Sequence, residues 1–210
     1  MPSYLAILAC AALAAMSTLS STWTPGAQLR SGSVKELAAG KILVATRGLP
    51  DSNFSETVIL LTQHGDTGSM GLVINDRTTL AAAKLFPQLE PPHSRPSLLF
   101  VGGPVSPDGA LALLRSPRPV PDALAVLDDV YLISTAEAIR EPIVTGADQA
   151  RFRVYVGYSG WGAGQLARET TLGAWHVFAG DADVVFDADP DTLWQRQVRR
   201  TEGRMASALP

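Results

Sequence analysis

Short runs of aliphatic and β-branched residues, separated by glycine, proline and polar clusters, recur along most of the chain. Runs of this length and composition are typical of buried strands and too short for most helices. Two of them flank the turn His64–Gly68, so the segment 57–75 predicts a β-hairpin. The predicted strands are 41–46, 57–62, 70–75, 98–101, 110–114, 131–133, 152–156, 174–179 and 184–186.

Capping signals predict where helices begin. Serine and glutamate have capping-box spacing over 33–36 and again over 134–137. The pair Asp189-Pro190 predicts the N-cap and first turn of a last helix. Two further helices are predicted at 79–86 and 164–170. The mixture of strands and helices predicts an α/β (mixed α+β) fold.

The chain divides into an N-terminal extension and one domain. We find no internal repeat, and the proline-rich segments 87–96 and 116–121 are interpreted as loops inside a domain spanning 33–205. Residues 1–30 differ in composition, because their apolar stretch 4–19 contains no charged side chain. A stretch of this length suits a signal-peptide core better than a membrane span of about twenty residues.

Three interpretations of residues 1–30 stay open: a signal peptide, an uncleaved membrane anchor, or a start codon assigned too far upstream. The first two imply export or anchoring, and only this segment would then contact a membrane. The single cysteine, Cys10, lies in the same stretch. One cysteine excludes an intramolecular disulfide and a cysteine-based metal site in the domain.

Overall charge gives little guidance to a partner. The formal net charge is −3 and 46% of the residues are hydrophobic, which is typical of a globular protein. A chain with this charge has no general attraction to nucleic acid. Arginines do concentrate over 196–204, where a solvated helix face explains them better than a phosphate site. We therefore expect no direct nucleic-acid binding.

Four glycines and two large aromatic residues lie together over 157–166, directly after the predicted strand 152–156. Glycine allows positive φ and close backbone approach, so we predict a shaped loop that binds either a ligand or another part of the protein. Its spacing excludes three motifs. Trp161 replaces the final glycine of a nucleophile elbow, the glycines do not fit a dinucleotide fingerprint, and no phosphate-loop lysine follows.

Side chains of this run are candidates for a binding rim. Tyr158 and Trp161 could stack on a ligand or pack internally, and packing is the more common role of aromatic residues beside glycine. Gln165 and Glu169 lie one helical turn apart and could present an amide and a carboxylate together. The sequence shows no basic partner that would make Glu169 a general base.

The hairpin carries three more candidates. Asn53 and Asn75 flank it, and asparagine commonly holds turns by bonding to the backbone. His64 lies in its turn, where a structural or exposed imidazole is more common than a catalytic one. Together with His93 and His176 it shows no metal-ligand spacing, so we predict no metal site and no cofactor.

Four motifs in order resemble the YqgE/AlgH family of bacterial proteins, and with Glu169 and Trp175 they extend over residues 37–200. The motifs are Phe54–Leu61 followed by His64, Gly71–Asn75, Gly102–Val105 and Gly157–Leu166. The resemblance implies a single domain in which a strongly bent mixed sheet forms a pseudo-barrel flanked by helices. It implies no established reaction and a cytosolic location, although one branch is named as a candidate transcriptional regulator of alginate production. Asp76-Arg77 departs from the Arg-Pro usual at that position.

Three hypotheses for function follow. The first is a non-enzymatic regulatory or interaction protein with a protein or small-molecule partner. The second is a hydrolase or transferase with a site around His64, Ser159 and Glu169, and the third is a purely structural domain. The first hypothesis predicts one binding rim formed by Asn53, His64, Asn75, Gly102, Gly103, Tyr158, Trp161, Gln165 and Glu169.

Overall fold

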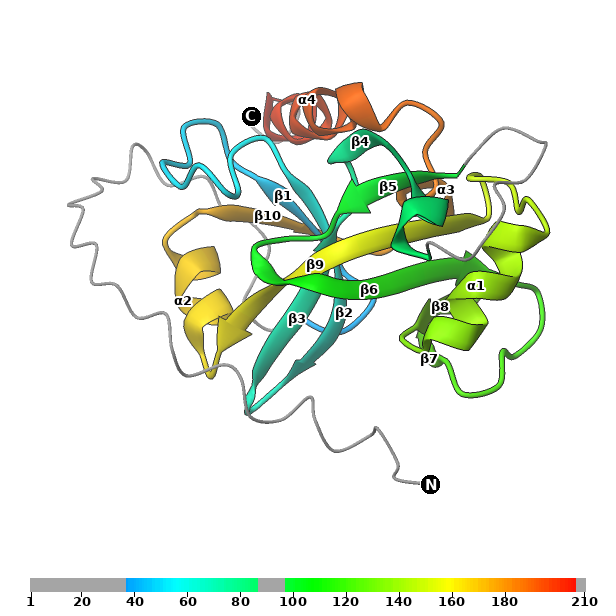
Figure 1. The fold of residues 1–210 in the computed structure, drawn as a ribbon. Helices are drawn as coiled ribbons and strands as arrows, with labels where there is room; N and C mark the ends of the chain where they lie inside the picture. Colours follow the sequence, from blue (N-terminus) through cyan, green and yellow to red (C-terminus); the bar gives the residue numbers. More distant parts are fainter. Residues whose placement is uncertain (1–36, 87–96, 207–210) are drawn as a thin grey trace.

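A ten-stranded sheet organises the described part of the chain (Figure 1). The computed structural model describes residues 37–86 and 97–206, with side chains as far as Thr201. The strand order is β10-β1-β2-β3-β9-β6-β8-β7, and β5 pairs with both β9 and β4. The strands are β1 Ile42–Ala45, β2 Val58–Gly65, β3 Gly68–Val73, β4 Arg77–Ala81, β5 Leu98–Val101, β6 Val105–Arg115, β7 Leu124–Leu127, β8 Val130–Ile133, β9 Phe152–Gly162 and β10 Trp175–Phe178.

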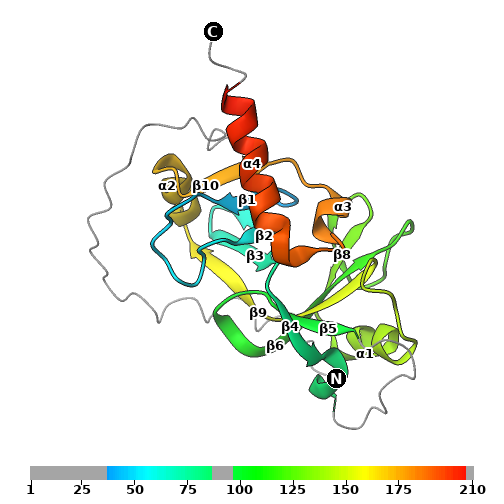
Figure 2. The same ribbon diagram turned by 90° about the horizontal axis from the view of Figure 1, so that it is seen from above.

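Helices cover the sheet from several sides. Helix α4 (Leu193–Ala206) lies along β1, as Figure 2 shows, and α2 (Gln165–Thr171) packs near β3, β9 and β10. Helix α1 (Ala136–Val144) contacts β6. The short turns are α3 (Ala182–Val185), η3 (Ala82–Leu85) and η4 (Pro190–Thr192). The predicted mixed α+β class is confirmed.

The sheet is mixed because β9 has a parallel neighbour. Strand β5 runs parallel to β9, whereas the other paired strands are antiparallel. Over Val154–Val156, β9 lies between β5 and β6; over Ser159–Gly162 it pairs with β3. Gly102 lies at this fork, since its N–H donates to the Val156 carbonyl (2.8 Å) and its carbonyl accepts from the Val73 N–H (3.0 Å). The sheet therefore divides into two branches at the middle of β9.

The two ends of the strand order come together at Gly40 and Gly180. A Cβ atom at Gly180 would lie 1.9 Å from the Gly40 carbonyl oxygen, and one at Gly40 would lie 2.6 Å from the Val126 oxygen of β7. Residues next to β1 and β10 therefore contact β7 directly. This closure gives the bent sheet its pseudo-barrel form.

Three sequence predictions are wrong in the type of structure. The predicted strand 184–186 is instead the end of α3, because Asp181 accepts a hydrogen bond from the Asp183 N–H (2.9 Å) and caps a helical turn. The predicted helix 79–86 begins as β4, which pairs with β5, and only 82–85 are helical. The loop predicted over 157–164 is strand as far as Gly162, since β3 supplies a partner.

Other predictions differ in extent or lie outside the described residues. The sequence does not predict strand β7, and β6 is longer than the predicted 110–114. The capping box at 33–36 and the segment 1–30 lie outside the described residues, as does the loop 87–96. In the part of the chain that is described, no helix has both the length and the apolar character of a membrane span.

Candidate functional site

The Glu169 carboxylate accepts hydrogen bonds from three side chains. Its Oε2 accepts from the indole N–H groups of Trp161 (3.0 Å) and Trp175 (2.9 Å). Its Oε1 accepts from the Gln165 amide (2.9 Å), whose own Oε1 accepts from the Gly162 N–H (3.1 Å). Glu169 on α2 thus connects the end of β9 to β10, and both of its oxygens are already engaged by donors.

Phe54 closes an aromatic cluster around the two tryptophans. Its ring stacks on Trp161 with centroids 5.9 Å apart and meets Trp175 edge-on at 5.9 Å. The two indoles are themselves T-shaped at 6.1 Å. Trp161 is 5% exposed and Trp175 is 1% exposed. The rings therefore pack on one another, and Trp161 holds the loop before β2 against β9.

Glycines allow two backbones to cross at the fork in the sheet. A Cβ atom at Gly157, where φ is +67°, would lie 2.3 Å from the Gly103 carbonyl oxygen. A Cβ atom at Gly103 would lie 2.5 Å from the Ser159 nitrogen and Oγ. Ser159 is fully buried, and its hydroxyl donates to the Gly102 carbonyl (3.1 Å). These residues fix the crossing of two chain segments.

Asn75 holds the turn that precedes β2. Its Oδ1 accepts from the Val58 N–H (2.7 Å) and its Nδ2 donates to the Glu56 carbonyl (3.0 Å). Glu56 has φ of +57°, a conformation that a β-carbon disfavours, so external bonds are needed to keep it. Asn53 lies in the same loop, is exposed, and donates its backbone N–H to Asp51 (2.8 Å).

The remaining candidates lie at the surface around Trp161. His64 is exposed, and its Nδ1 lies 2.7 Å from the Ser69 hydroxyl. Ser69 pairs with Trp161 across β3 and β9. Gln165 is exposed, whereas Tyr158 is half-buried against the core. We call Asn53, His64 and Gln165 the Trp161 rim. Phe54, next to Asn53, stacks on Trp161; Ser69, the partner of His64, pairs with Trp161; and Gln165 shares the Glu169 carboxylate with it.

The side chains of His64, Ser159 and Glu169 form hydrogen bonds to separate partners. Each makes its own contacts, to Ser69, to the Gly102 carbonyl and to two indoles, and none of these hydrogen bonds joins one of the three to another. Among the residues described, no three His, Cys, Asp or Glu side chains gather as metal ligands would.

Two hollows adjoin the segment Ala179–Gly180, away from the predicted rim residues. The first, about 190 Å³, has Ile42, Phe178 and Val184 in its wall and Arg200 at its edge. The second, about 380 Å³, is lined by residues that follow β10, precede β1 or belong to the β7–β8 turn. No sequence motif indicated this region.

Comparison with known proteins agrees with this architecture. The model of the AlgH-like family (DUF179) matches residues 42–206, which is most of the chain. The chain belongs to the AlgH-like family. Its relatives include a UPF0301 protein of Streptomyces coelicolor, 35% identical over 80% of this chain and 88% of the relative. A UPF0301 protein of Thermobifida fusca is 34% identical with the same coverage.

Solved structures share the AlgH-like fold. The solution structure of the AlgH protein from Pseudomonas aeruginosa matches with a TM-score of 0.64 and 26% identity, over 88% of this chain and 98% of that one. A crystal structure of a Corynebacterium diphtheriae protein matches with a TM-score of 0.65 and 23% identity, over 79% and 87% of the two chains. The expected family is thus confirmed, while the function of the family is uncharacterised.

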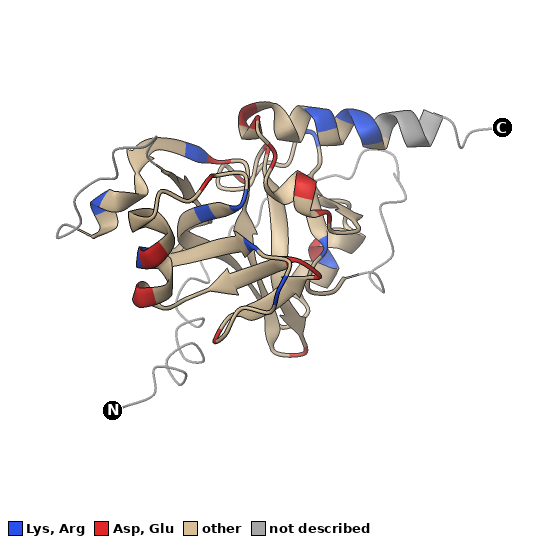
Figure 3. Ribbon diagram, turned by 90° about the vertical axis from the view of Figure 1, so that its right-hand side faces the viewer, with Lys and Arg blue, Asp and Glu red and all other residues tan. Residues whose placement is uncertain are grey.

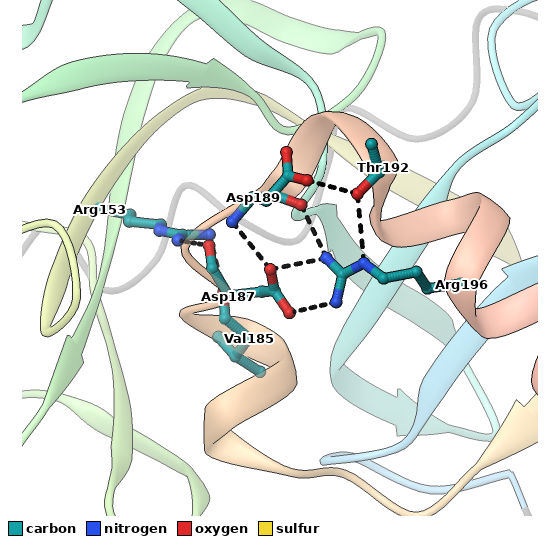
Figure 4. A network of polar contacts seen from close by, with 6 residues as sticks. All are labelled: Arg153, Val185, Asp187, Asp189, Thr192 and Arg196. Atoms are coloured by element: carbon teal, nitrogen blue, oxygen red, sulfur yellow. Dashed lines mark hydrogen bonds and ion pairs between the residues drawn. The ribbon is translucent and has the colours of Figure 1, made fainter.

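Sequence reasoning missed a buried arginine in this AlgH-like domain. Arg153 of β9 is 3% exposed, and its guanidinium donates to the carbonyls of Gln149 (3.2 Å), Val185 (3.0 Å) and Asp187. Figure 4 shows Arg153 with Asp187 and Val185. It also lies over the Phe100 ring, 4.8 Å from the centroid. The single charged residue within an apolar strand was the only signal in the sequence.

Tyr155 also lies on β9, two residues after Arg153. Burial raises the pKa of its phenol to about 12, and the nearby Arg153 charge lowers that pKa by a smaller amount. We expect its phenol to titrate near pH 12 in an absorbance titration, and Tyr155→Phe to remove that step. The folded pKa exceeds the unfolded value of about 10, so the un-ionised Tyr155 phenol makes its full contribution to folding stability below pH 10. This contribution falls by about 3 kcal/mol between pH 10 and pH 12. A Tyr155 step near pH 10 contradicts the expectation.

Replacing Glu169 tests the cluster around Trp161. In Glu169→Leu two buried indole N–H groups lose their acceptor, so we expect unfolding free energy to fall by about 2–4 kcal/mol. In Glu169→Gln one oxygen remains, but the new NH₂ faces the Gln165 donor, and a loss of about 1–2 kcal/mol is expected. Denaturant unfolding followed by tryptophan fluorescence measures both. The exposed Glu137 on α1 provides the control Glu137→Gln, and equal losses at the two sites contradict the assignment.

Proposed function

We propose that this AlgH-like protein is a non-enzymatic interaction protein that binds a protein partner at the Trp161 rim. The supporting observation is the Glu169 carboxylate with its three side-chain donors. It gives the exposed rim side chains a rigid base, and rigid presentation lowers the entropic cost of binding.

The internal contacts of the other predicted residues support binding over catalysis. Hydrogen bonds to the protein's own backbone or side chains engage the polar atoms of Ser159, Asn75 and Glu169. Asn53 and His64 are exposed and can meet a partner. The regulatory role for which one family branch is named as a candidate is compatible with this proposal, since a regulator can act through a protein without contacting DNA.

Affinity capture with the full-length chain tests the proposal. The bait variant Asn53→Ala/His64→Ala removes two exposed rim side chains that lie outside the buried core, and Arg140→Ala on α1 is a matched surface control. We expect one partner to be recovered with wild type and Arg140→Ala and to fall at least about tenfold with the rim variant. Direct binding to that purified partner then has to show the same loss.

The same recovery with all three baits, at unchanged melting temperature, overturns the rim as a binding surface. The proposal is also overturned if the Arg140→Ala bait loses the partner as strongly as the rim variant does, because the effect is then not specific to the rim. Gln165→Ala is unsuitable as the first variant, since Gln165 also holds Gly162 and Glu169.

A further inference from the structure

The hollow of about 190 Å³ lies where the end of β10, the beginning of α3 and α4 meet. Its apolar wall consists of Ile42 on β1, Phe178 on β10 and Val184 on α3. An apolar cavity of about 150 Å³ can hold a molecule of the size of benzene, whereas sites for drug-sized ligands usually measure about 300–1,000 Å³. This hollow therefore suits a small aliphatic molecule.

The Gln197 side chain lines the hollow with an amide that has no hydrogen-bond partner among the described residues. Gln197 is 9% exposed and belongs to the buried face of α4. The sealed side-chain atoms that lack a partner in the described part of the chain belong to Tyr155 and Gln195, so the Gln197 amide is not sealed off from solvent. Polar groups at such depth are normally hydrogen-bonded, and a molecule in the hollow can supply the missing partner.

Two opposite charges border the hollow without pairing with each other. Arg200 lies one helical turn after Gln197 on α4, and Figure 3 shows basic residues along this helix. Asp181 is the N-cap of α3, where its Oδ1 accepts from the Asp183 N–H (2.9 Å). Arg200 and Asp181 are both exposed, and neither forms an ion pair with a side chain that the structure describes. Both charges are therefore accessible to a ligand.

We propose that this hollow binds a small aliphatic α-amino acid of the size of valine or leucine. The Arg200 guanidinium donates to its carboxylate, and the Asp181 carboxylate accepts from its ammonium group. The branched side chain of the ligand packs against Phe178 and Val184. The Gln197 amide has both donors and an acceptor, so it adds a hydrogen bond to the charged end of the ligand. A simple carboxylate would leave Asp181 without a partner, and a simple amine would leave Arg200 without one.

NMR titration of the ¹⁵N-labelled full chain tests this site. The probes are L-leucine and L-valine, each beside two analogues that lack either the ammonium or the carboxylate (for leucine, 4-methylpentanoate and 3-methylbutylamine). We expect one amino acid to bind with a Kd below about 1 mM and both of its analogues to bind at least about tenfold more weakly. The shifted resonances should be those of residues 178–184 and of the Gln197 side-chain NH₂ group.

Variants of the protein assign the contacts. Arg200→Gln is expected to weaken amino-acid binding about tenfold and to leave binding of the carboxylate-free amine unchanged. Asp181→Asn keeps the helix cap, since asparagine caps as well as aspartate does, and is expected to weaken binding of the amino acid but not of the ammonium-free acid. Gln197→Met keeps the length of the side chain without the amide and is expected to weaken binding at least about threefold. Arg199→Gln, at an exposed neighbouring position outside the hollow, is the matched control and is expected to bind as wild type does.

Three results overturn the proposal: no binding of either amino acid at about 10 mM, equal binding of an analogue that lacks one charge, or wild-type binding in any of the three site variants. If Gln197→Met does not fold, the analogues and the two variants at exposed positions still decide. The site is separate from the Trp161 rim, so Asn53→Ala/His64→Ala is expected to leave amino-acid binding unchanged. Failure of one proposal is thereby distinguished from failure of the other.

Discussion

Gly157→Ala is expected to lower the free energy of unfolding by about 3 kcal/mol or more. A left-handed backbone costs a residue with a β-carbon about 1–2 kcal/mol, and forcing extra atoms into a packed site costs about 1–3 kcal/mol. Both penalties apply at Gly157, because φ is +67° and the new atom would lie 2.3 Å from the Gly103 carbonyl oxygen. Relief requires one of the two crossing backbones to move, and this crossing is where β9 changes neighbours.

Two other glycines separate these penalties. Gly48 has φ of +80°, and an added Cβ atom there would meet nothing within 4 Å, so Gly48→Ala tests the backbone penalty alone. Gly65 has neither a positive φ nor a close neighbour, and Gly65→Ala is expected to change stability by less than about 0.5 kcal/mol. Urea unfolding of the three variants measures the differences. If Gly157→Ala loses no more unfolding free energy than Gly48→Ala, the backbone crossing imposes no steric constraint. If only Gly157→Ala fails to fold, the steric constraint is supported.

The sequence predicted most strands because their apolar runs are local signals. The hairpin of β2 and β3, together with β1, β5 and β10, is recognisable from short β-branched segments between turns. The fork in the sheet has no such signal. It depends on hydrogen bonds between Gly102 and both Val73 and Val156, which lie 29 and 54 positions away, and local sequence does not encode partners at such distances.

The candidate site shows the same division. One-turn spacing placed Gln165 beside Glu169, and their side chains are hydrogen-bonded. That the carboxylate would also accept from Trp161 and Trp175 follows from how β9, α2 and β10 meet, which local spacing does not contain. Phe54 was recognised within a family motif, but its stacking on Trp161 needed the tertiary structure.

Arg153→Ala is expected to cost about 3–5 kcal/mol of unfolding free energy, because three carbonyls lose their donor and the packing of the buried side chain is lost. The guanidinium is the donor for three carbonyls, and two of them, on Val185 and Asp187, lie at the end of α3 and just beyond it. Carbonyls left without a donor cost about 1–3 kcal/mol each when they stay buried. Burial lowers the pKa of Arg153, so the guanidinium is held against a desolvation penalty that its carbonyl partners and the Phe100 ring offset.

The effect of Arg153→Ala should reach α4 through Asp187. The Asp187 carbonyl accepts from Arg153, while its carboxylate accepts from Arg196 (2.7 Å) on α4, as Figure 4 shows. Denaturant unfolding gives the total loss, and hydrogen exchange should show the fastest local opening at residues 182–189. Arg151→Ala is the control, because Arg151 is exposed two residues away and is expected to change stability by less than about 0.5 kcal/mol. Arg153→Lys is expected to recover only part of the loss, since one ammonium group cannot reproduce the planar fork that reaches three carbonyls. Full recovery by lysine, or a loss no larger than that of Arg151→Ala, contradicts this role for the buried guanidinium.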